Sequence, residues 1–116
     1  MCIRDSAYRA GITNPLVRQL ASPEEPAAHV YHLYVITCPH RDELKAHLLA
    51  QDVQALIHYP VPVHDQIPCN ALQRDPLGLK ASEDHAAKCL SLPCHPQMTD
   101  ADVSQVIAAV NSCKAA

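Results

Sequence analysis

The chain of 116 residues contains no phenylalanine and no tryptophan, and only four tyrosines. Aromatic side chains normally supply much of the buried area of a small core. Leucine, valine, isoleucine and alanine must therefore form most of this core, and a chain of this length has room for only one of modest size. We interpret the shortage of aromatic residues as a sign that the domain packs against something larger.

The chain also lacks the signals of several functional classes. Only Gly11 and Gly78 are glycines, so a glycine-rich phosphate-binding loop is absent. The formal charge of −3 contains no block of like charges, which argues against nucleic acid and anionic membranes as partners. No apolar run approaches the ~20 residues of a membrane helix, and the first residues lack an apolar signal core. We expect a cytoplasmic protein.

Six cysteines are present, but their pattern predicts neither disulfides nor a metal site. No CxxC pair occurs, and cytosolic cysteines are usually reduced. The stretches Cys38–Pro–His40 and Cys94–His95 have irregular spacings, whereas structural zinc takes four ligands, usually in closely spaced pairs. A Cys–His nucleophile would lack a recognisable orienting group and oxyanion donors. We therefore predict no metal.

The first 28 residues show little periodic structure. Residues 1–6, MCIRDS, fit no helix or strand pattern and resemble translated adapter sequence at the edge of a fragmented reading frame. We expect a non-native leader here, with an ordinary disordered tail as the alternative. Residues 7–28 predict the end of a helix that begins at Pro15, followed by a loop.

Residues 29–116 predict an α/β, more narrowly α+β, small domain in which helices cover a short sheet. HVYHLYVIT (29–37) is typical of a strand with both faces covered, and VQALIHY (53–59) of a second strand. Between them RDELKAHLLAQ (41–51) has leucines at helical spacing. The short interval favours a βαβ-like unit or a helix laid on a small sheet.

The second half of the chain begins with a long loop over residues 60–80, which has four prolines and no sustained period. Loops of that length within a compact domain are often functional. A helix capped by its first serine is expected over 82–90, and a brief strand over 91–93. Thr99 is the expected N-cap of the last helix, with Asp102 completing a shortened capping box before an apolar stripe.

Three stretches together resemble one family: HVYHLYVI (29–36), RDELKAHLLAQDVQALIHYPVPVHDQ (41–66) and SEDHAAKCLSLPCHPQMTDADVSQVIAAV (82–110). They are similar to the C-terminal part of the DegT/DnrJ/EryC1/StrS aminotransferases, pyridoxal-phosphate enzymes that aminate keto sugars carried on nucleotides. The most specific pieces are the H-Y-P-x-P-x-H run and SLPxxPxMT. Asp52 stands where the family often has glycine, but aspartate tolerates the left-handed conformation.

The resemblance implies the C-terminal small domain of a fold-type I pyridoxal-phosphate transferase, spanning 29–116. It implies pyridoxal 5'-phosphate as the cofactor of the intact enzyme, a nucleotide-sugar substrate, an amino-acid donor such as glutamate, and a homodimer. The family's Schiff-base lysine lies in its large domain. The four lysines of this chain stand outside that motif: Lys45, Lys80, Lys88 and Lys114. We predict no catalytic residue in this chain and no transamination by it alone.

The loop start HYPVPVHDQ (58–66) is the candidate substrate-binding segment. In the resembled family this run borders the active site, which points to His58, Tyr59 and His64, with Gln66 as a weaker companion. The two prolines fix φ and stiffen the segment, and the rings can donate hydrogen bonds to hydroxyl and phosphate oxygens. A structural loop with a buried, satisfied histidine is the alternative interpretation.

Three functions stay open at this point. An aminotransferase for amino-sugar or polysaccharide synthesis leads. A sugar dehydratase of the same family, which uses the cofactor without a lysine, differs from it in the large domain. A free-standing metal- or protein-binding module without catalysis would instead fold alone as a soluble monomer, whereas an orphan small domain would expose an apolar face and associate.

Overall fold

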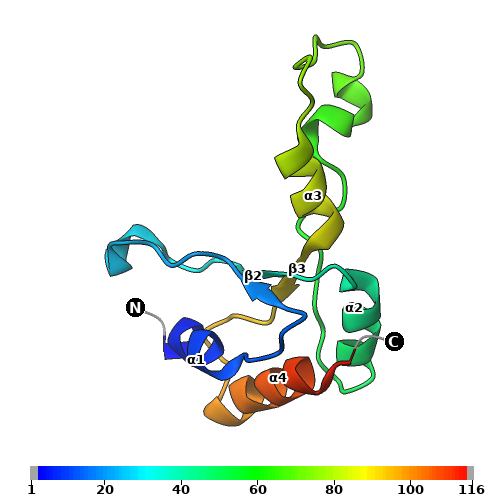
Figure 1. The fold of residues 1–116 in the computed structure, drawn as a ribbon. Helices are drawn as coiled ribbons and strands as arrows, with labels where there is room; N and C mark the ends of the chain where they lie inside the picture. The colour runs from blue at the N-terminus through cyan, green and yellow to red at the C-terminus, as the bar shows by residue number, and fades with distance from the viewer. Residues whose placement is uncertain (1–2, 115–116) are drawn as a thin grey trace.

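The computed structural model describes residues 3–114, in which a small antiparallel sheet is flanked by helices and a long arm projects away from it (Figure 1). The strand order is β1–β2–β3, and a single bridge joins Leu56 to Ser91 beside the last strand. The strands are β1 (Arg18–Gln19), β2 (Tyr34–Thr37) and β3 (Cys89–Leu92).

Four α-helices and three short 3-10 helices complete the described chain. The α-helices are α1 (Ile3–Gly11), α2 (Arg41–Leu49), α3 (Lys80–Lys88) and α4 (Asp100–Ser112). The 3-10 helices are η1 (Pro26–Ala28), η2 (Val63–Asp65) and η3 (Ile67–Cys69). Within residues 3–114, no helix is both long and apolar enough to cross a membrane.

Two regions are distinguished below. The arm is residues 59–88, which leave the sheet, form η2 and η3 at the far end and return through α3 (Figure 1). The body is the rest of the described chain. The molecule is accordingly elongated, with extents of 48 × 38 × 24 Å.

The body has an aliphatic core completed by two tyrosines. Ile36, Leu44 and Leu90 are fully buried or nearly so, and each such side chain contributes about 1.5–3 kcal/mol by leaving water. Tyr8 is also fully buried, with its ring 5.0 Å from that of Tyr34. The Tyr34 hydroxyl donates to Gln19 Oε1 at 2.5 Å, and burial raises the pKa of Tyr34 to about 12.

The predicted last helix is confirmed, including its cap. The Asp102 backbone N–H donates to Thr99 Oγ1 at 3.2 Å, and Asp102 Oδ2 accepts from the Thr99 N–H at 2.7 Å. Hydrogen bonds from Thr99 hold the pKa of the Asp102 carboxyl below its usual range. Met98 and Val103 are both buried, as a hydrophobic staple across the cap requires.

The predicted helix over 41–51 is confirmed as α2, with Leu44 and Leu48 buried. Leu49 is 65% exposed and lies outside the core. The turn after the helix places Asp52 at φ 58°. The aspartate therefore adopts the left-handed conformation expected of it.

Two structural expectations for the front of the chain were wrong: that residues 3–6 fit no helix and that a helix begins at Pro15. The non-native origin of residues 1–6 stays a prediction. Residues 3–6 lie in α1, where the Arg4 guanidinium donates to Pro96 O at 2.6 Å and Met98 O at 2.8 Å; residues 1–2 of the predicted leader lie outside the described residues. No helix begins at Pro15, because Asn14 anchors the chain instead. Asn14 Nδ2 donates to Val110 O at 2.7 Å and its Oδ1 accepts from Leu16 N, a local bond that competes with helix formation.

Both predicted strands were too long. Residues 29–33 are not a strand, because Tyr31 has φ 47° and donates its N–H to His29 Nδ1 at 2.8 Å. Val30 is 87% exposed, so this part of the segment is not covered on both faces. Residues 53–59 make only the bridge at Leu56 before the chain leaves as the arm.

The strand pairs β1–β2 and β2–β3 and the Leu56 bridge to β3 are all antiparallel. The chain at Leu56 therefore runs parallel to β2 with β3 between them, and α2 links the two, so the predicted βαβ-like unit is present in split form. The remaining correction concerns the start of α3. α3 begins at Lys80 after Leu79, without a side-chain cap. Ser82 therefore lies inside the helix, and Leu90 belongs to β3.

Candidate functional site

A cavity of about 710 Å³ lies in the arm between the proline-rich loop and α3. Its volume falls in the range of small-molecule and cofactor sites. Aliphatic side chains and polar rings share the lining. The lining residues are His58, Tyr59, Val61, Pro62, Val63, His64, Cys69, Leu72, Gln73, Arg74, Asp75, Leu79, Ala81, Ser82, His85 and Ala86.

His58 stands where the arm leaves the body. Its Nδ1 lies 2.9 Å from Ser91 Oγ of β3, and its ring meets that of Tyr59 edge-on with centroids 5.3 Å apart. The Cys89 thiol lies 3.7 Å from the His58 carbonyl oxygen. The histidine is therefore tied to the sheet through both its ring and its backbone.

Tyr59 follows directly and is 71% exposed. Its ring lines the cavity without being part of the body core. An exposed tyrosine presents an apolar face and a phenolic hydroxyl, which suits contact with a ligand that is part ring and part polar.

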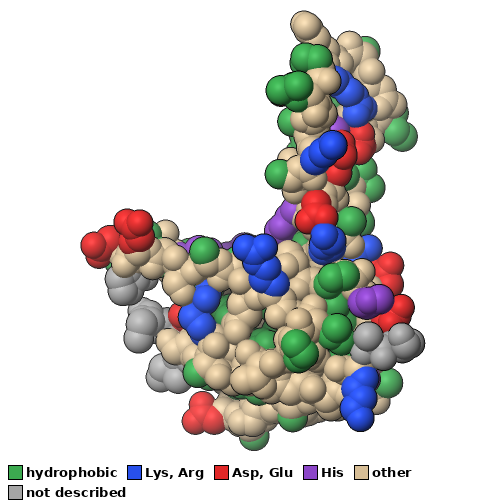
Figure 2. Space-filling model, in the orientation of Figure 1, with side chains coloured by type: hydrophobic (Ala, Val, Ile, Leu, Met, Phe, Trp, Pro, Cys, Tyr) green, Lys and Arg blue, Asp and Glu red, His purple; other side chains and the backbone are tan. Residues whose placement is uncertain are grey.

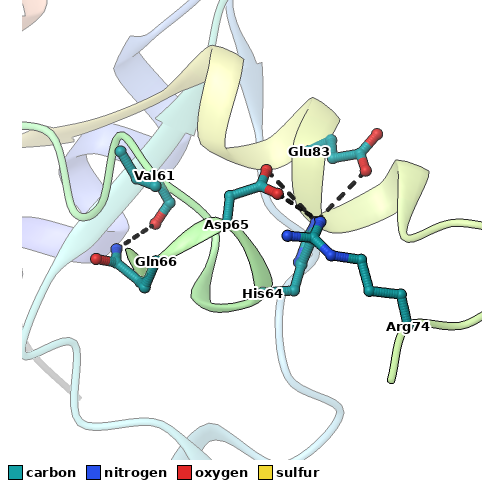
Figure 3. Close-up of polar contacts among 6 residues, drawn as sticks. All are labelled: Val61, His64, Asp65, Gln66, Arg74 and Glu83. Atoms are coloured by element: carbon teal, nitrogen blue, oxygen red, sulfur yellow. Dashed lines mark hydrogen bonds and ion pairs between the residues drawn. The ribbon is translucent and has the colours of Figure 1, made fainter. Parts of the chain in front are cut away.

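His64 belongs to a charged cluster with Asp65, Arg74 and Glu83 (Figure 3). Its side chain is only 14% exposed, and Nε2 lies 3.4 Å from Glu83 Oε1 of α3. An ionised carboxylate can only accept, so this nitrogen carries a proton. The contact joins the loop wall of the cavity to its helical wall.

Arg74 and Asp65 form the tightest pair of this cluster. Arg74 Nη1 donates to Asp65 Oδ1 at 2.7 Å. That hydrogen bond, with the charge of His64, holds the pKa of the Asp65 carboxyl below its usual range. Because Asp65 takes up one side of the guanidinium, the rest of the Arg74 group remains a donor at the cavity wall.

Gln66 lies apart from the other three candidates. It does not line the cavity, and its Nε2 donates to Val61 O at 3.2 Å on the other side of the loop (Figure 3). Its contact here stabilises the loop. The structure thus brings His58, Tyr59 and His64 to one cavity and leaves Gln66 outside it.

The arm is fastened to the body at the end of α3. Arg41 of α2, with a side chain 14% exposed, donates from Nη1 to Ala86 O at 2.7 Å. A cation at the last carbonyls of a helix is favourable because it satisfies an orphan acceptor and complements the helix dipole. The cavity walls are therefore held at one end by a charged hydrogen bond.

Sequence patterns did not predict several residues of this site. Arg74 is an isolated arginine in a proline-rich loop, Ser82 was interpreted as a cap, and Ser91 belonged to a brief strand. The sequence signal for Arg74 was its position, because it is a long cationic side chain in the same loop segment as His58 and His64 and follows both of them. Ser91 had none, because its partner His58 is distant in sequence.

The side chains that line this cavity suit the binding of a ligand. Imidazole, phenol and guanidinium donors suit hydroxyl and phosphate oxygens, and the aliphatic wall suits the faces of sugar or base rings. Among residues 3–114, no group of three or more histidine, cysteine or acidic side chains is placed to hold a metal ion.

These features define a class: a small α+β domain that carries a ligand-sized cavity on a projecting arm. The model of the DegT/DnrJ/EryC1/StrS aminotransferase family matches residues 6–111, nearly the whole chain. The chain belongs to that family.

Individual relatives agree. A protein of Aneurinibacillus thermoaerophilus named dTDP-3-amino-3,6-dideoxy-alpha-D-galactopyranose transaminase is 35% identical over 104 residues, covering 90% of this chain and 28% of the relative. The dTDP-3-amino-3,4,6-trideoxy-alpha-D-glucose transaminase of Streptomyces venezuelae is 42% identical over 82 residues, covering 70% and 21%.

A solved structure shares the fold. The crystal structure of S. venezuelae DesV in complex with a ketimine intermediate superposes with a TM-score of 0.84 at 31% identity, over 93% of this chain and 29% of that one. The chain therefore spans less than a third of the length of the relatives it matches.

Proposed function

We propose that this chain is the C-terminal small domain of a pyridoxal-phosphate aminotransferase. The intact enzyme transfers an amino group from an amino acid, glutamate in the leading form, to a keto-sugar nucleotide for amino-sugar or polysaccharide synthesis. Family membership and the names of the dTDP-sugar transaminases support this activity. The observation that carries it here is the cavity, with His58, Tyr59 and His64 on its wall.

In this proposal the arm binds the substrate rather than performing the chemistry. His58 and Tyr59 donate to sugar hydroxyls at the root of the arm, and Arg74 meets the diphosphate from the opposite loop. The aliphatic lining, including Val61 and Leu79, covers the flat faces of the ligand. Charge-assisted donors give such a site its orientation. Gln66 contributes indirectly, by bracing the loop through Val61.

The cofactor does not fit the described cavity as its resident group. Pyridoxal phosphate supplies an electron sink for amino transfer and is held through a lysine amine. No lysine lines the cavity, and Lys88 is paired with Asp84 on α3. We propose that the cofactor and its lysine belong to a part of the intact enzyme outside this chain, and we expect the chain alone to be inactive.

The proposal includes three further predictions from the sequence. The intact enzyme is a homodimer, it acts in the cytoplasm, and nucleic acid and membranes are not its partners. The family dehydratase remains the second candidate, because the feature that separates it from an aminotransferase would lie outside this chain. The free-standing binding module is disfavoured by family membership over residues 6–111.

The test begins by sequencing the DNA upstream of the Ala7 codon from an intact template and expressing the complete reading frame. Its product is then given a dTDP-keto sugar with and without glutamate. Glutamate-dependent formation of the amino sugar supports the proposal, whereas loss of water from the sugar without any amino donor supports the dehydratase. Absence of both reactions, or a frame that begins at Met1, would overturn the aminotransferase assignment.

Variants of the complete enzyme test the role of the arm. His58→Ala and Tyr59→Phe remove donors at the cavity, and each should raise KM for the sugar nucleotide about fivefold to tenfold, the value of one hydrogen bond. His40→Ala is the matched control, because His40 lies on the body, its ring contacts Glu43 and it does not line the cavity. An unchanged KM in both arm variants would remove the arm from the substrate site.

A further inference from the structure

Ser91 is a buried hydroxyl at the centre of the sheet. It is 4% exposed, and it lies opposite Val35 of β2 on one side and the Leu56 bridge on the other. Its backbone N–H donates to Leu56 O at 2.7 Å, and its carbonyl accepts from Leu56 N at 3.1 Å. With both backbone groups bonded, the position of the side chain is fixed by the sheet.

The side chain has one polar neighbour. Ser91 Oγ lies 2.9 Å from His58 Nδ1, and it has no second polar partner within residues 3–114. A buried hydroxyl proton left without an acceptor is costly, roughly 1–3 kcal/mol. The favoured arrangement is therefore the one in which the serine O–H donates and Nδ1 accepts.

That direction decides the state of the imidazole. In a neutral histidine one ring nitrogen accepts and the other carries the proton. If Nδ1 accepts from Ser91, the proton stays on Nε2. Nε2 itself has no hydrogen-bonding partner in the described chain and is not among its buried, unsatisfied atoms, so it remains open to a ligand.

We propose that Ser91 is a positioning residue that holds His58 as its Nε2–H tautomer, so that the ring presents a donor to an acceptor oxygen of the ligand. This inference rests on the proposed function, since it gives His58 a substrate to meet. His58 lines both the large cavity and a second one of about 150 Å³ that Ser91 also lines. The hydroxyl thus acts from behind the ring, without touching the ligand.

The proposal restricts the ligand chemistry at this point. An Nε2–H group recognises a hydroxyl or phosphate oxygen that can accept a hydrogen bond. In the opposite tautomer Nε2 would accept, and the ring would instead select a donor such as an amine. Ser91 therefore sets which kind of group the root of the arm binds.

The tautomer is read by long-range ¹H–¹⁵N correlation NMR on the ¹⁵N-labelled complete enzyme at a pH of about 8, where an ordinary histidine is neutral. The His58 signals are assigned by their loss in His58→Gln. We expect the wild-type proton on Nε2. Ser91→Thr, which keeps the hydroxyl, should retain this pattern, and Ser91→Ala should give a mixture of both tautomers.

A wild-type proton on Nδ1 would overturn the proposal without need of any variant. So would a folded Ser91→Ala protein, judged by its amide spectrum, that keeps the pure Nε2–H pattern, because serine would then only fill space. Wild-type Nε2–H together with a Ser91→Thr spectrum that matches it supports the role even where Ser91→Ala fails to fold.

Ligand binding to the complete enzyme and its variants gives the second readout, with dTDP as the probe. Loss of the positioning bond should weaken dTDP binding about fivefold in Ser91→Ala, as for one hydrogen bond, with recovery in Ser91→Thr. If wild type shows the Nε2–H pattern but does not bind dTDP, the proposed function fails at this site while the assignment of the tautomer stands. If both variants bind like wild type, Ser91 has no positioning role.

Discussion

The body and the arm are stabilised in different ways. In the body, large side chains such as Ile36, Leu48 and Val110 are fully buried. In the arm, Ala86 alone is buried among residues 59–88, and many apolar side chains face outward (Figure 2). The exposed large apolar residues of the arm are Tyr59, Val61, Val63, Ile67, Leu72, Leu77 and Leu79.

Polar contacts, rather than a hydrophobic core, stabilise the arm. Asp65 bonds Arg74, His64 bonds Glu83, and Arg41 holds the last turn of α3 from the body. Prolines restrict the backbone of the loop between these contacts. Segments with few buried contacts open at low free energy, and binding surfaces are often drawn from them. This difference supports the proposal that the body is the scaffold and that the arm contacts the ligand.

Truncating one leucine in each region tests most directly whether the body and the arm differ in their buried cores. Leu90→Ala removes a fully buried side chain of β3 and should lower the free energy of unfolding by about 3 kcal/mol. Leu77→Ala is the matched control at 86% exposure in the arm and should change it by less than about 0.5 kcal/mol. Urea unfolding of both variants measures the difference; equal losses would mean that the arm has a core of its own.

A smaller effect on stability is expected at the N-cap of α4. The helix α3 of the arm has no side-chain cap. Thr99→Ala removes the Oγ1 atom that accepts from the Asp102 N–H and donates to Asp102 Oδ2, and it keeps the bond from the Thr99 backbone N–H to Asp102. The change should cost about 1 kcal/mol of unfolding free energy. Ser104→Ala on the exposed side of the same helix is the control and should be neutral or slightly stabilising. If thermal unfolding shows Thr99→Ala unchanged, the box does not stabilise the body.

The smallest effects concern two aspartates, one in each region. The pKa values of Asp65 and Asp102 are both held below the ordinary 3.8, by Arg74 and Thr99 respectively. Because the folded-state values are lowered, both contacts stabilise above that pH and are lost as the pH falls through the folded-state values. Carboxyl NMR titration should show Arg74→Met restoring Asp65 alone. A simultaneous change at Asp102 would indicate that arm and body are coupled.

Sequence reasoning succeeded where a pattern is local. α2 and α4 were predicted because leucines at helical spacing and a cap with its partner three residues on are readable without tertiary structure. The length of the first strand was overestimated, because the Tyr31 N–H donates to the nearby His29 ring and the backbone turns at that point. The helix placed at Pro15 failed for a different reason, since Asn14 is engaged by the end of α4.

The same distinction applies to the site. His58, Tyr59 and His64 lie close together in sequence, and all three line the cavity. Arg74 and Ser91 were not predicted, because their roles depend on contacts with Asp65 and with His58, which only the folded chain brings together. The sequence pattern thus located the residues of one cavity wall, whereas Arg74 and Ser91 could be identified only from tertiary contacts.

Titration of the ¹⁵N-labelled complete enzyme with dTDP, followed by amide NMR, tests most directly whether the arm is the ligand-binding region. We expect shifts at the amides of the cavity residues of the arm, led by Tyr59, His64 and Arg74, while amides of α2 and α4 keep their positions. UDP in a parallel titration measures the preference for the base. Shifts confined to the body, or none at saturating dTDP, would contradict the claim.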